Sequence, residues 1–262
     1  MSDPAARSLA AFPRRLAQAL RRRLVARASL PPAHVVPLGL SCRVAYQVRT
    51  CFASATAYPF DWWLTPIDAL TRYLLRPDPE RIYGRGALAE LVVGDQISAI
   101  VAPEFGFQLF HEFPRQDIGR PARVVAPDWR DHVAAARNRH TQRLDRFLAL
   151  DQPGNRILFV RDRLDAESGS GLRAPAESVA GLWHALSKLF PRAGIELLLI
   201  NVPALRLPHQ SAVRRIDFVD PPGEPPEAWR GDSERWARAF AAAGYRTRPG
   251  GGATAAPVGP PD

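Results

Sequence analysis

The fold is decided by the run H-V-V-P-L-G-L-S-C at residues 34–42, in which a short apolar strand is followed by a glycine turn and a serine suited to begin a helix. Apolar side chains then recur at helical spacing at Val44, Ala45, Val48, Cys51 and Phe52. The stretch therefore predicts a strand, a tight turn and a helix in direct succession, which is a typical unit of an α/β fold.

Two further apolar runs lie in the second half of the chain, at Ile157–Val160 and Ile195–Ile200. Each follows an amphipathic segment, and we predict helices over Asp128–Leu150 and Pro175–Phe190. Buried strands that alternate with such helices indicate a parallel sheet covered on both faces. We therefore predict a single α/β domain over residues 31–248, with an open, mostly parallel sheet and helices on both faces in three layers.

Shorter elements are predicted between and after these runs. Thr65, Pro66 and Asp68 favour the start of a helix that ends near Leu75. Strands are predicted at Ile97–Val101, Phe105–Phe110 and Ile216–Val219, and a last helix at Asp232–Ala243.

The basic charge of the chain is concentrated at its N-terminus. Residues 1–30 hold seven arginines and one aspartate, which is +6 of the net +9. The remaining +3 is too small for a nucleic-acid footprint over the domain, so we expect no specific nucleic-acid partner. Residues 1–30 are predicted to form a basic amphipathic extension that is either solvated or in contact with an anionic surface. The tail at residues 249–262 is rich in Gly, Pro and Ala and is predicted to be disordered.

Cysteine usage favours a reducing, cytoplasmic location. Cys42 and Cys51 are the two cysteines, and on one helix they would lie roughly 13 Å apart, beyond the ~7 Å reach of a disulfide. No stretch approaches the roughly 20 apolar residues of a transmembrane segment. The sequence contains no spacing typical of a metal site and no G-x-G-x-x-G turn, so we predict no metal and no cofactor.

Cys42 is the candidate nucleophile. Its predicted place in the first turn of a helix favours an anion, so we expect its thiol pKa to be lowered. The structural alternative is a small buried cysteine that fills the junction between strand and helix.

Ligands of open α/β sheets bind beyond the carboxyl ends of the strands. Ser41, His111, Arg161 and Asn201 each lie at or just after the end of a predicted strand, so we expect them near Cys42. Ser41, Arg161 and Asn201 are the candidate binding residues. A thiol, a histidine and an orienting acid or amide are the ingredients of nucleophilic acyl transfer.

His111 is the preferred candidate base because it comes directly off a predicted strand. His140 is the alternative, although its place on the inward stripe of a helix is more typical of a hydrogen-bonded core histidine, and His184 lies on the outer side of its helix. Asp61 stands among aromatic residues and needs hydrogen-bond donors if it is buried. It either orients His111 or secures its own turn, and we favour the second role.

Several blocks occur in a characteristic order: L-G-L-S-C at 38–42, Y-P-F-D-W at 58–62, F-H-E-F at 110–113, R-H-T-Q-R-L-D-R-F at 139–147 and I-L-F-V-R at 157–161. Their combination resembles a bacterial family of unknown function that is labelled a papain-like cysteine peptidase. The resemblance implies Cys42 as nucleophile, His111 as base, and Asp61 and Arg161 as polar positions typical of the family. Leu40 and Ser41 depart from the family, which more usually has small or amide residues there.

The strand and helix alternation differs from a papain-like fold, which has a helical lobe and a barrel-like lobe. Cys42 after the first strand is similar in position to the serine of SGNH-type hydrolases. The leading hypothesis is therefore a cysteine-dependent hydrolase or acyl-transfer enzyme acting on an unknown peptide, glycan or small-molecule substrate. The alternative is a non-catalytic binding module for a nucleotide-sugar or glycan ligand, with Arg161 and Asn201 at the ligand edge.

Overall fold

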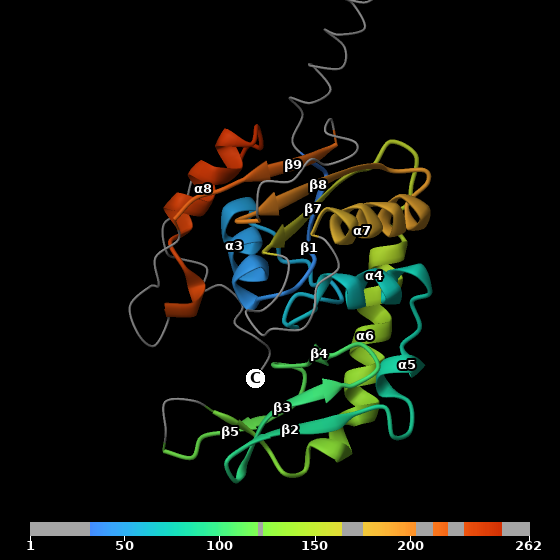
Figure 1. Cartoon of the computed structure of the whole chain (residues 1–262), viewed down its shortest axis with the longest axis vertical. Helices are drawn as coiled ribbons and strands as arrows, with labels where there is room; N and C mark the ends of the chain where they lie inside the picture. The colour runs from blue at the N-terminus through green and yellow to red at the C-terminus, as the bar shows by residue number, and fades with distance from the viewer. Residues whose placement is uncertain (1–31, 120–122, 164–174, 203–211, 220–227, 248–262) are drawn as a thin grey trace, which may run out of the picture.

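A four-stranded parallel sheet lies in the upper part of the molecule as drawn in Figure 1. The computed structural model describes residues 32–119, 123–163, 175–202, 212–219 and 228–247. The strands of this sheet lie in the order β1 (His34–Pro37), β7 (Arg156–Asp162), β8 (Gly194–Ile200) and β9 (Val213–Ile216). All neighbouring strands of the sheet are parallel, which confirms the predicted sheet.

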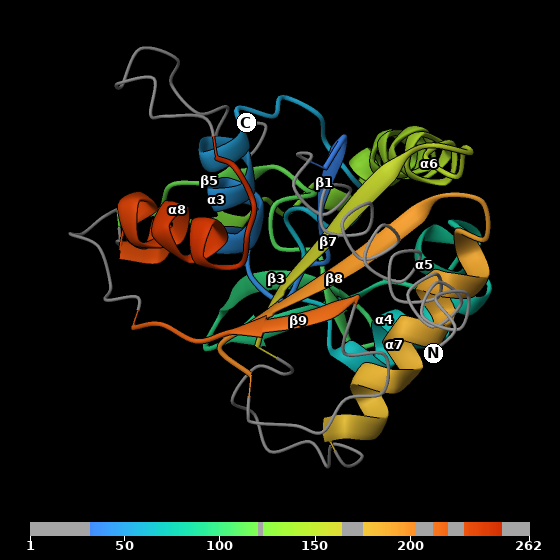
Figure 2. The same cartoon turned by 90° about the horizontal axis from the view of Figure 1, so that it is seen from above.

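Alternate side chains of β7 point to opposite faces of the sheet, as a period of two requires. Leu158 and Val160 join one apolar cluster, and Ile157 and Phe159 join the other. The first cluster is covered by α3 (Cys42–Phe52) and α8 (Ser233–Ala242), and the second by α4 (Ile67–Leu75) and α7 (Pro175–Leu189). Figure 2 shows the two helical layers on either side of the strands. The predicted three layers are confirmed.

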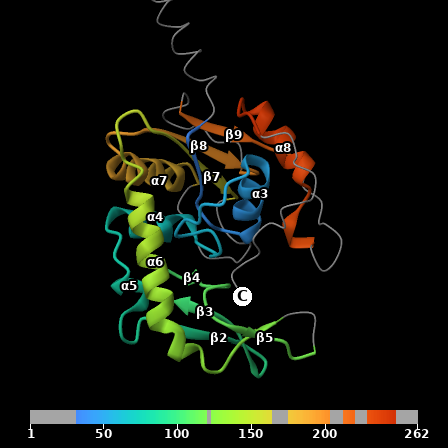
Figure 3. The same ribbon diagram turned by 180° about the vertical axis from the view of Figure 1, so that it is seen from behind.

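Two small antiparallel sheets lie beside the parallel sheet. The first contains β2 (Ala89–Val93), β3 (Gln96–Ala102) and β4 (Phe107–Gln108), and the second contains β5 (Arg115–Gln116) and β6 (Val124–Val125). The long helix α6 (Val133–Leu148) passes from the antiparallel sheets to the parallel sheet (Figure 3), and the short helix α5 (Glu80–Tyr83) contacts α6.

Several predicted boundaries are wrong. The strand expected at Phe105–Phe110 is only β4, because Phe105 and Gly106 lie in the turn from β3 and Gly106 has a left-handed φ of 67°. The helix expected from Asp128 begins with a 3-10 turn, η1 (Trp129–His132), and Asp128 makes no side-chain cap. The strand expected at Ile216–Val219 is β9, which ends at Ile216.

The remaining described element is a 3-10 turn, η2 (Ala228–Arg230). Within the described ranges, no helix is long and apolar enough to cross a membrane. The predictions for residues 1–30 and 249–262 lie outside the described residues.

Candidate functional site

A left-handed turn at Gly39 and Leu40 connects β1 to α3 and so determines where Cys42 lies. Their φ angles are 72° and 70°. A Cβ on Gly39 would collide with Thr65 Oγ1, so both the backbone conformation and the close approach require glycine there. Thr65 Oγ1 donates to Leu38 O at 3.1 Å and accepts from Leu40 N at 3.3 Å. Thr65 therefore holds this turn, whereas the sequence predicts it as a helix cap.

Arg161 holds the same turn together with Thr65, and we call these two side chains the clamp. Its side chain is fully buried. Its guanidinium donates to Leu38 O at 2.9 Å and to Thr65 O at 2.6 Å. The sequence predicts Arg161 at the ligand edge, whereas in the structure its guanidinium donates to backbone carbonyls. Its observed role is to position the segment that carries Cys42.

Cys42 is the first residue of α3 and is partly buried. Its thiol donates to Trp62 O at 3.8 Å. Ser41 occupies the N-cap position without a side-chain cap, and in the described part of the chain its buried hydroxyl oxygen has no hydrogen-bond partner. No acidic residue occupies the first turn of α3. The start of α3 is therefore uncapped by side chains.

The Cys42 thiol is protonated at neutral pH. Burial raises its pKa to about 12, although the backbone N–H of Cys42 and the charge of Arg115 act in the opposite direction. The expected lowering of this pKa is therefore wrong for the unliganded protein. Desolvation of the thiolate outweighs the stabilisation that the helix start provides.

His111 lies in the turn after β4, at the antiparallel sheet and not at the end of a strand of the parallel sheet. Its ring meets the edge of Trp62 at a centroid distance of 6.0 Å and the ring of Phe110 at 5.0 Å. Burial and the charge of Arg115 lower the pKa of His111 to about 4, so its imidazole is neutral at pH 7. Among the described residues no hydrogen bond joins Cys42 to a histidine, and Trp62 is the residue that contacts both.

Asp61 is buried in the turn that carries Trp62. One carboxylate oxygen accepts from Arg49 at 2.7 Å and from Tyr58 N at 3.1 Å. Burial raises the pKa of Asp61, while Arg49 opposes that rise. Over the described ranges Asp61 makes no hydrogen bond to a histidine. Its contacts tie the turn to α3, and Arg49 also lies 5.1 Å from the centre of the Trp62 ring.

His140 is a core histidine, as the sequence pattern favours. Its Nε2 pairs with Tyr73 Oη at 2.9 Å, and its ring stacks on Trp63 at a centroid distance of 4.7 Å. Burial lowers the pKa of His140 to about 3. His184 is exposed on α7. These contacts account for His140 as a structural residue, so His111 remains the candidate base.

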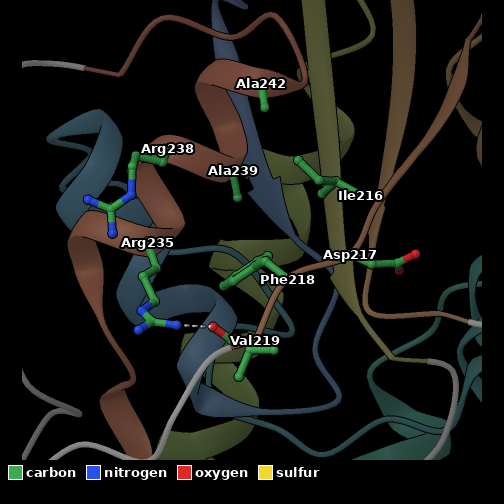
Figure 4. A pocket seen from close by; sticks show the side chains of 8 residues that line it. All are labelled: Ile216, Asp217, Phe218, Val219, Arg235, Arg238, Ala239 and Ala242. Carbon is green, nitrogen blue, oxygen red and sulfur yellow. Dashed lines mark hydrogen bonds between the residues drawn. The ribbon is translucent and has the colours of Figure 1, made fainter.

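Asn201 connects the ends of two strands. Its backbone has a left-handed φ of 54°, its Oδ1 accepts from Phe218 N at 2.9 Å, and its N–H donates to Ile216 O at 3.0 Å. Beyond Ile216 lies a pocket of about 330 Å³, shown in Figure 4, in which Arg235 donates to Val219 O. None of the sequence-predicted site residues lines this pocket.

Arg115 is a site residue that the sequence analysis missed. It begins β5, and its guanidinium lies 4.4 Å from the centre of the Phe110 ring. Its charge acts on both Cys42 and His111. Its hydrogen bonds go to the backbone carbonyls of Ser98, Phe110 and Arg123, and a sequence motif does not reveal such partners.

Comparison of the chain with models of known protein families, with curated proteins and with solved structures gives no match. The described residues contain no group of three or more His, Cys, Asp or Glu side chains that could hold a metal ion. The arrangement of Cys42, His111, Trp62 and Arg115 is therefore interpreted from its own chemistry.

Proposed function

We propose that this protein is a cysteine-dependent hydrolase or acyl-transfer enzyme with Cys42 as nucleophile and His111 as base. The observation that carries the proposal is the clamped turn at Gly39 and Leu40, which holds Cys42 at the uncapped start of α3 beyond the carboxyl end of β1. Backbone strain concentrates at functional sites, and the carboxyl edge of a parallel sheet is where such folds bind ligands.

The proposed reaction starts from a neutral thiol and a neutral imidazole. Cys42 Sγ leaves its bond to Trp62 O and attacks an acyl carbonyl carbon, and His111 takes the thiol proton. The protonated imidazole then gives this proton to the leaving group as the thioester forms. Water, or another acceptor, attacks the thioester and restores the thiol. Backbone N–H groups in the first turn of α3 are suited to stabilise the oxyanion.

In this reaction Asp61 and Arg161 are positioning residues, because one holds the Trp62 turn and the other holds the turn before Cys42. The alternative of a non-catalytic binding module is less well supported, since the side chains of Arg161 and Asn201 bind backbone groups. The substrate classes remain a peptide, a glycan ester or a small ester, the last two as in SGNH-type hydrolases. The two free thiols favour a reducing cytoplasm as the place of action.

Trapping of an acyl-enzyme tests the proposal. The folded protein is exposed briefly to an activated aryl ester or thioester, and the modified peptide is identified by mass spectrometry. We expect an acyl group on Cys42, none on Cys51, and product release that is lost in Cys42→Ala and reduced in His111→Ala. Cys51→Ser is the matched control and keeps both adduct and turnover. No adduct on Cys42 with a broad ester and peptide panel, or equal acylation of both thiols, contradicts the proposal.

A further inference from the structure

Two of the buried acids, Asp61 and Glu112, are paired with arginines. Asp61 pairs with Arg49 at 2.7 Å, and Glu112 pairs with Arg139 at 3.1 Å and with Arg143 at 3.2 Å. Because these ion pairs neutralise the acids locally, neither carboxylate is available to balance another cation without losing its own partner.

Arg115 has a different set of partners. It donates to the backbone carbonyls of Ser98, Phe110 and Arg123, and within the described ranges it forms no ion pair with a carboxylate. Within the described residues, the Nε–H of Arg115 donates no hydrogen bond to the protein. This nitrogen is also not one of the buried atoms without a hydrogen-bond partner. Arg115 is therefore a fixed, partly buried cation that carries an uncompensated charge and one remaining donor.

Contacts between neighbouring groups connect Arg115 to Cys42. The guanidinium lies on the ring of Phe110, that ring meets His111, His111 meets Trp62, and Trp62 O accepts from the thiol. In agreement with these contacts, the charge of Arg115 lowers the pKa of Cys42 and of His111, while the charge of Asp61 acts on Cys42 in the opposite direction. A substrate that reaches the thiol therefore enters the field of the Arg115 guanidinium, which pairs with no carboxylate in the described part of the chain.

We infer that the substrate of the Cys42 site carries a carboxylate or phosphate group and that Arg115 is the residue that selects for it. A guanidinium N–H donates a charge-assisted hydrogen bond to either anion, and an uncompensated cation in a partly buried site raises the local concentration of anions. This inference rests on the proposed function, since it names the substrate class of the same site.

The test compares the alkylation of Cys42 by anionic iodoacetate and by neutral iodoacetamide, read by peptide mass spectrometry at one pH. The iodoacetate-to-iodoacetamide rate ratio is expected to fall at least about threefold in Arg115→Gln. It should stay near the wild-type value in Arg115→Lys, which keeps the charge while losing the fork of hydrogen bonds. Arg130→Gln removes the same charge from an exposed position next to the antiparallel sheet and is the matched control.

A measurement on the wild-type protein avoids any folding defect of the variants. Raising the ionic strength from about 0.01 M to about 1 M shortens the screening length from about 30 Å to about 3 Å, so the rate ratio for Cys42 should fall. Succinate and inorganic phosphate, tested separately as protectants against iodoacetamide, distinguish a carboxylate-selective site from a phosphate-selective one.

Failure of this inference differs from failure of the proposed function. Normal iodoacetamide labelling and acyl-enzyme formation, with a rate ratio unchanged by salt and by Arg115→Gln, overturn the inference and leave the nucleophile in place. Cys42 that reacts with neither reagent and forms no acyl-enzyme overturns both.

Discussion

The helices α3 and α8 lie on the same face of the parallel sheet, and they differ in whether a side chain caps their N-terminus. Asp232 caps α8 by accepting from Glu234 N at 2.9 Å and from Arg235 N at 3.2 Å. Ser41 occupies the same position on α3 and makes no side-chain cap. Each helix start has a thiol beside it, since Cys42 begins α3 and Cys51 donates to Ser233 O at 3.8 Å.

This difference separates a helix start that a side chain caps from one that no side chain caps. Cys51 is buried, and burial raises its pKa to about 12, with no opposing group identified. Burial raises the pKa of Cys42 to a similar value, but its own backbone N–H and Arg115 oppose the rise. The fold thus places the partly buried cysteine residue at the start of the uncapped helix and the buried cysteine beside the capped one.

The largest loss of stability is expected when Arg161 is removed from the clamp on the turn before α3. Arg161→Leu leaves the carbonyl of Thr65 without its buried donor and that of Leu38 with Thr65 Oγ1 as its buried side-chain donor, at about 1–3 kcal/mol for each lost bond. We expect the free energy of unfolding in urea to fall by at least about 3 kcal/mol. Arg130→Leu, at an exposed ion pair, is the control and should change stability by less than about 1 kcal/mol. A small effect at Arg161 would show that the turn does not depend on the clamp.

Acid should weaken the region around Cys42 through His111. Its folded-state pKa of about 4 lies below the ordinary value of 6.5, so the unfolded chain binds the proton first. The stability that this residue contributes is therefore complete above about pH 6.5 and is lost as the pH falls toward 4. In His111→Asn we expect a shallower decline of unfolding free energy over this window, with a difference of about 2–3 kcal/mol between the ends. Parallel pH profiles for the two proteins would contradict the assignment.

Asp61→Asn tests whether the ion pair between Asp61 and Arg49 of α3 stabilises the turn that carries Trp62. The change removes the charge that Arg49 binds, and we expect a loss of about 1–2 kcal/mol in unfolding free energy. The measurement combines a urea melt with thiol labelling of Cys42. A wild-type melt with abolished Cys42 reactivity would instead place Asp61 in the reaction as an orienting acid.

The smallest effects come from the two capping positions themselves. Asp232→Ala removes two side-chain hydrogen bonds and should cost about 1 kcal/mol. Ser41→Ala removes a hydroxyl that makes no hydrogen bond in the described structure, so we expect a change below about 0.5 kcal/mol. The two thermal melts are compared directly. Equal losses would mean that Ser41 caps α3 in solution.

The sequence predicts the parallel sheet because its strands are short apolar runs bounded by turn residues. Ile157–Val160 and Ile195–Ile200 fall inside β7 and β8, and both faces of these strands are buried. β2 shows no such pattern because Leu91, Val92 and Val93 are exposed at the edge of its sheet. The sequence therefore predicts only part of this antiparallel sheet.

The candidate site is less predictable because its contacts join distant parts of the chain. Arg161 and Leu38 are 123 positions apart, and an arginine after an apolar run looks the same whether it binds a ligand or a carbonyl. The position of Cys42 at a helix start predicts a lowered thiol pKa, but burial raises this pKa, and burial depends on segments such as the Trp62 turn that pack against Cys42 from elsewhere in the chain. The role of Arg115 cannot be predicted from the sequence for a similar reason, because its hydrogen-bond partners are backbone oxygens.

The central claim is that Cys42, at the start of α3, is a reactive thiol, whereas Cys51 is a structural cysteine of the core. Competitive alkylation of the two thiols in one folded chain tests this claim most directly. Iodoacetamide is added under native conditions, and the rate constant of each cysteine is followed by peptide mass spectrometry. We expect Cys42 to react at least about tenfold faster than Cys51, because Cys42 is only partly buried and because its backbone N–H and Arg115 act against the rise of its thiol pKa, whereas burial alone raises that of Cys51. Equal rates, or faster reaction at Cys51, would contradict the account.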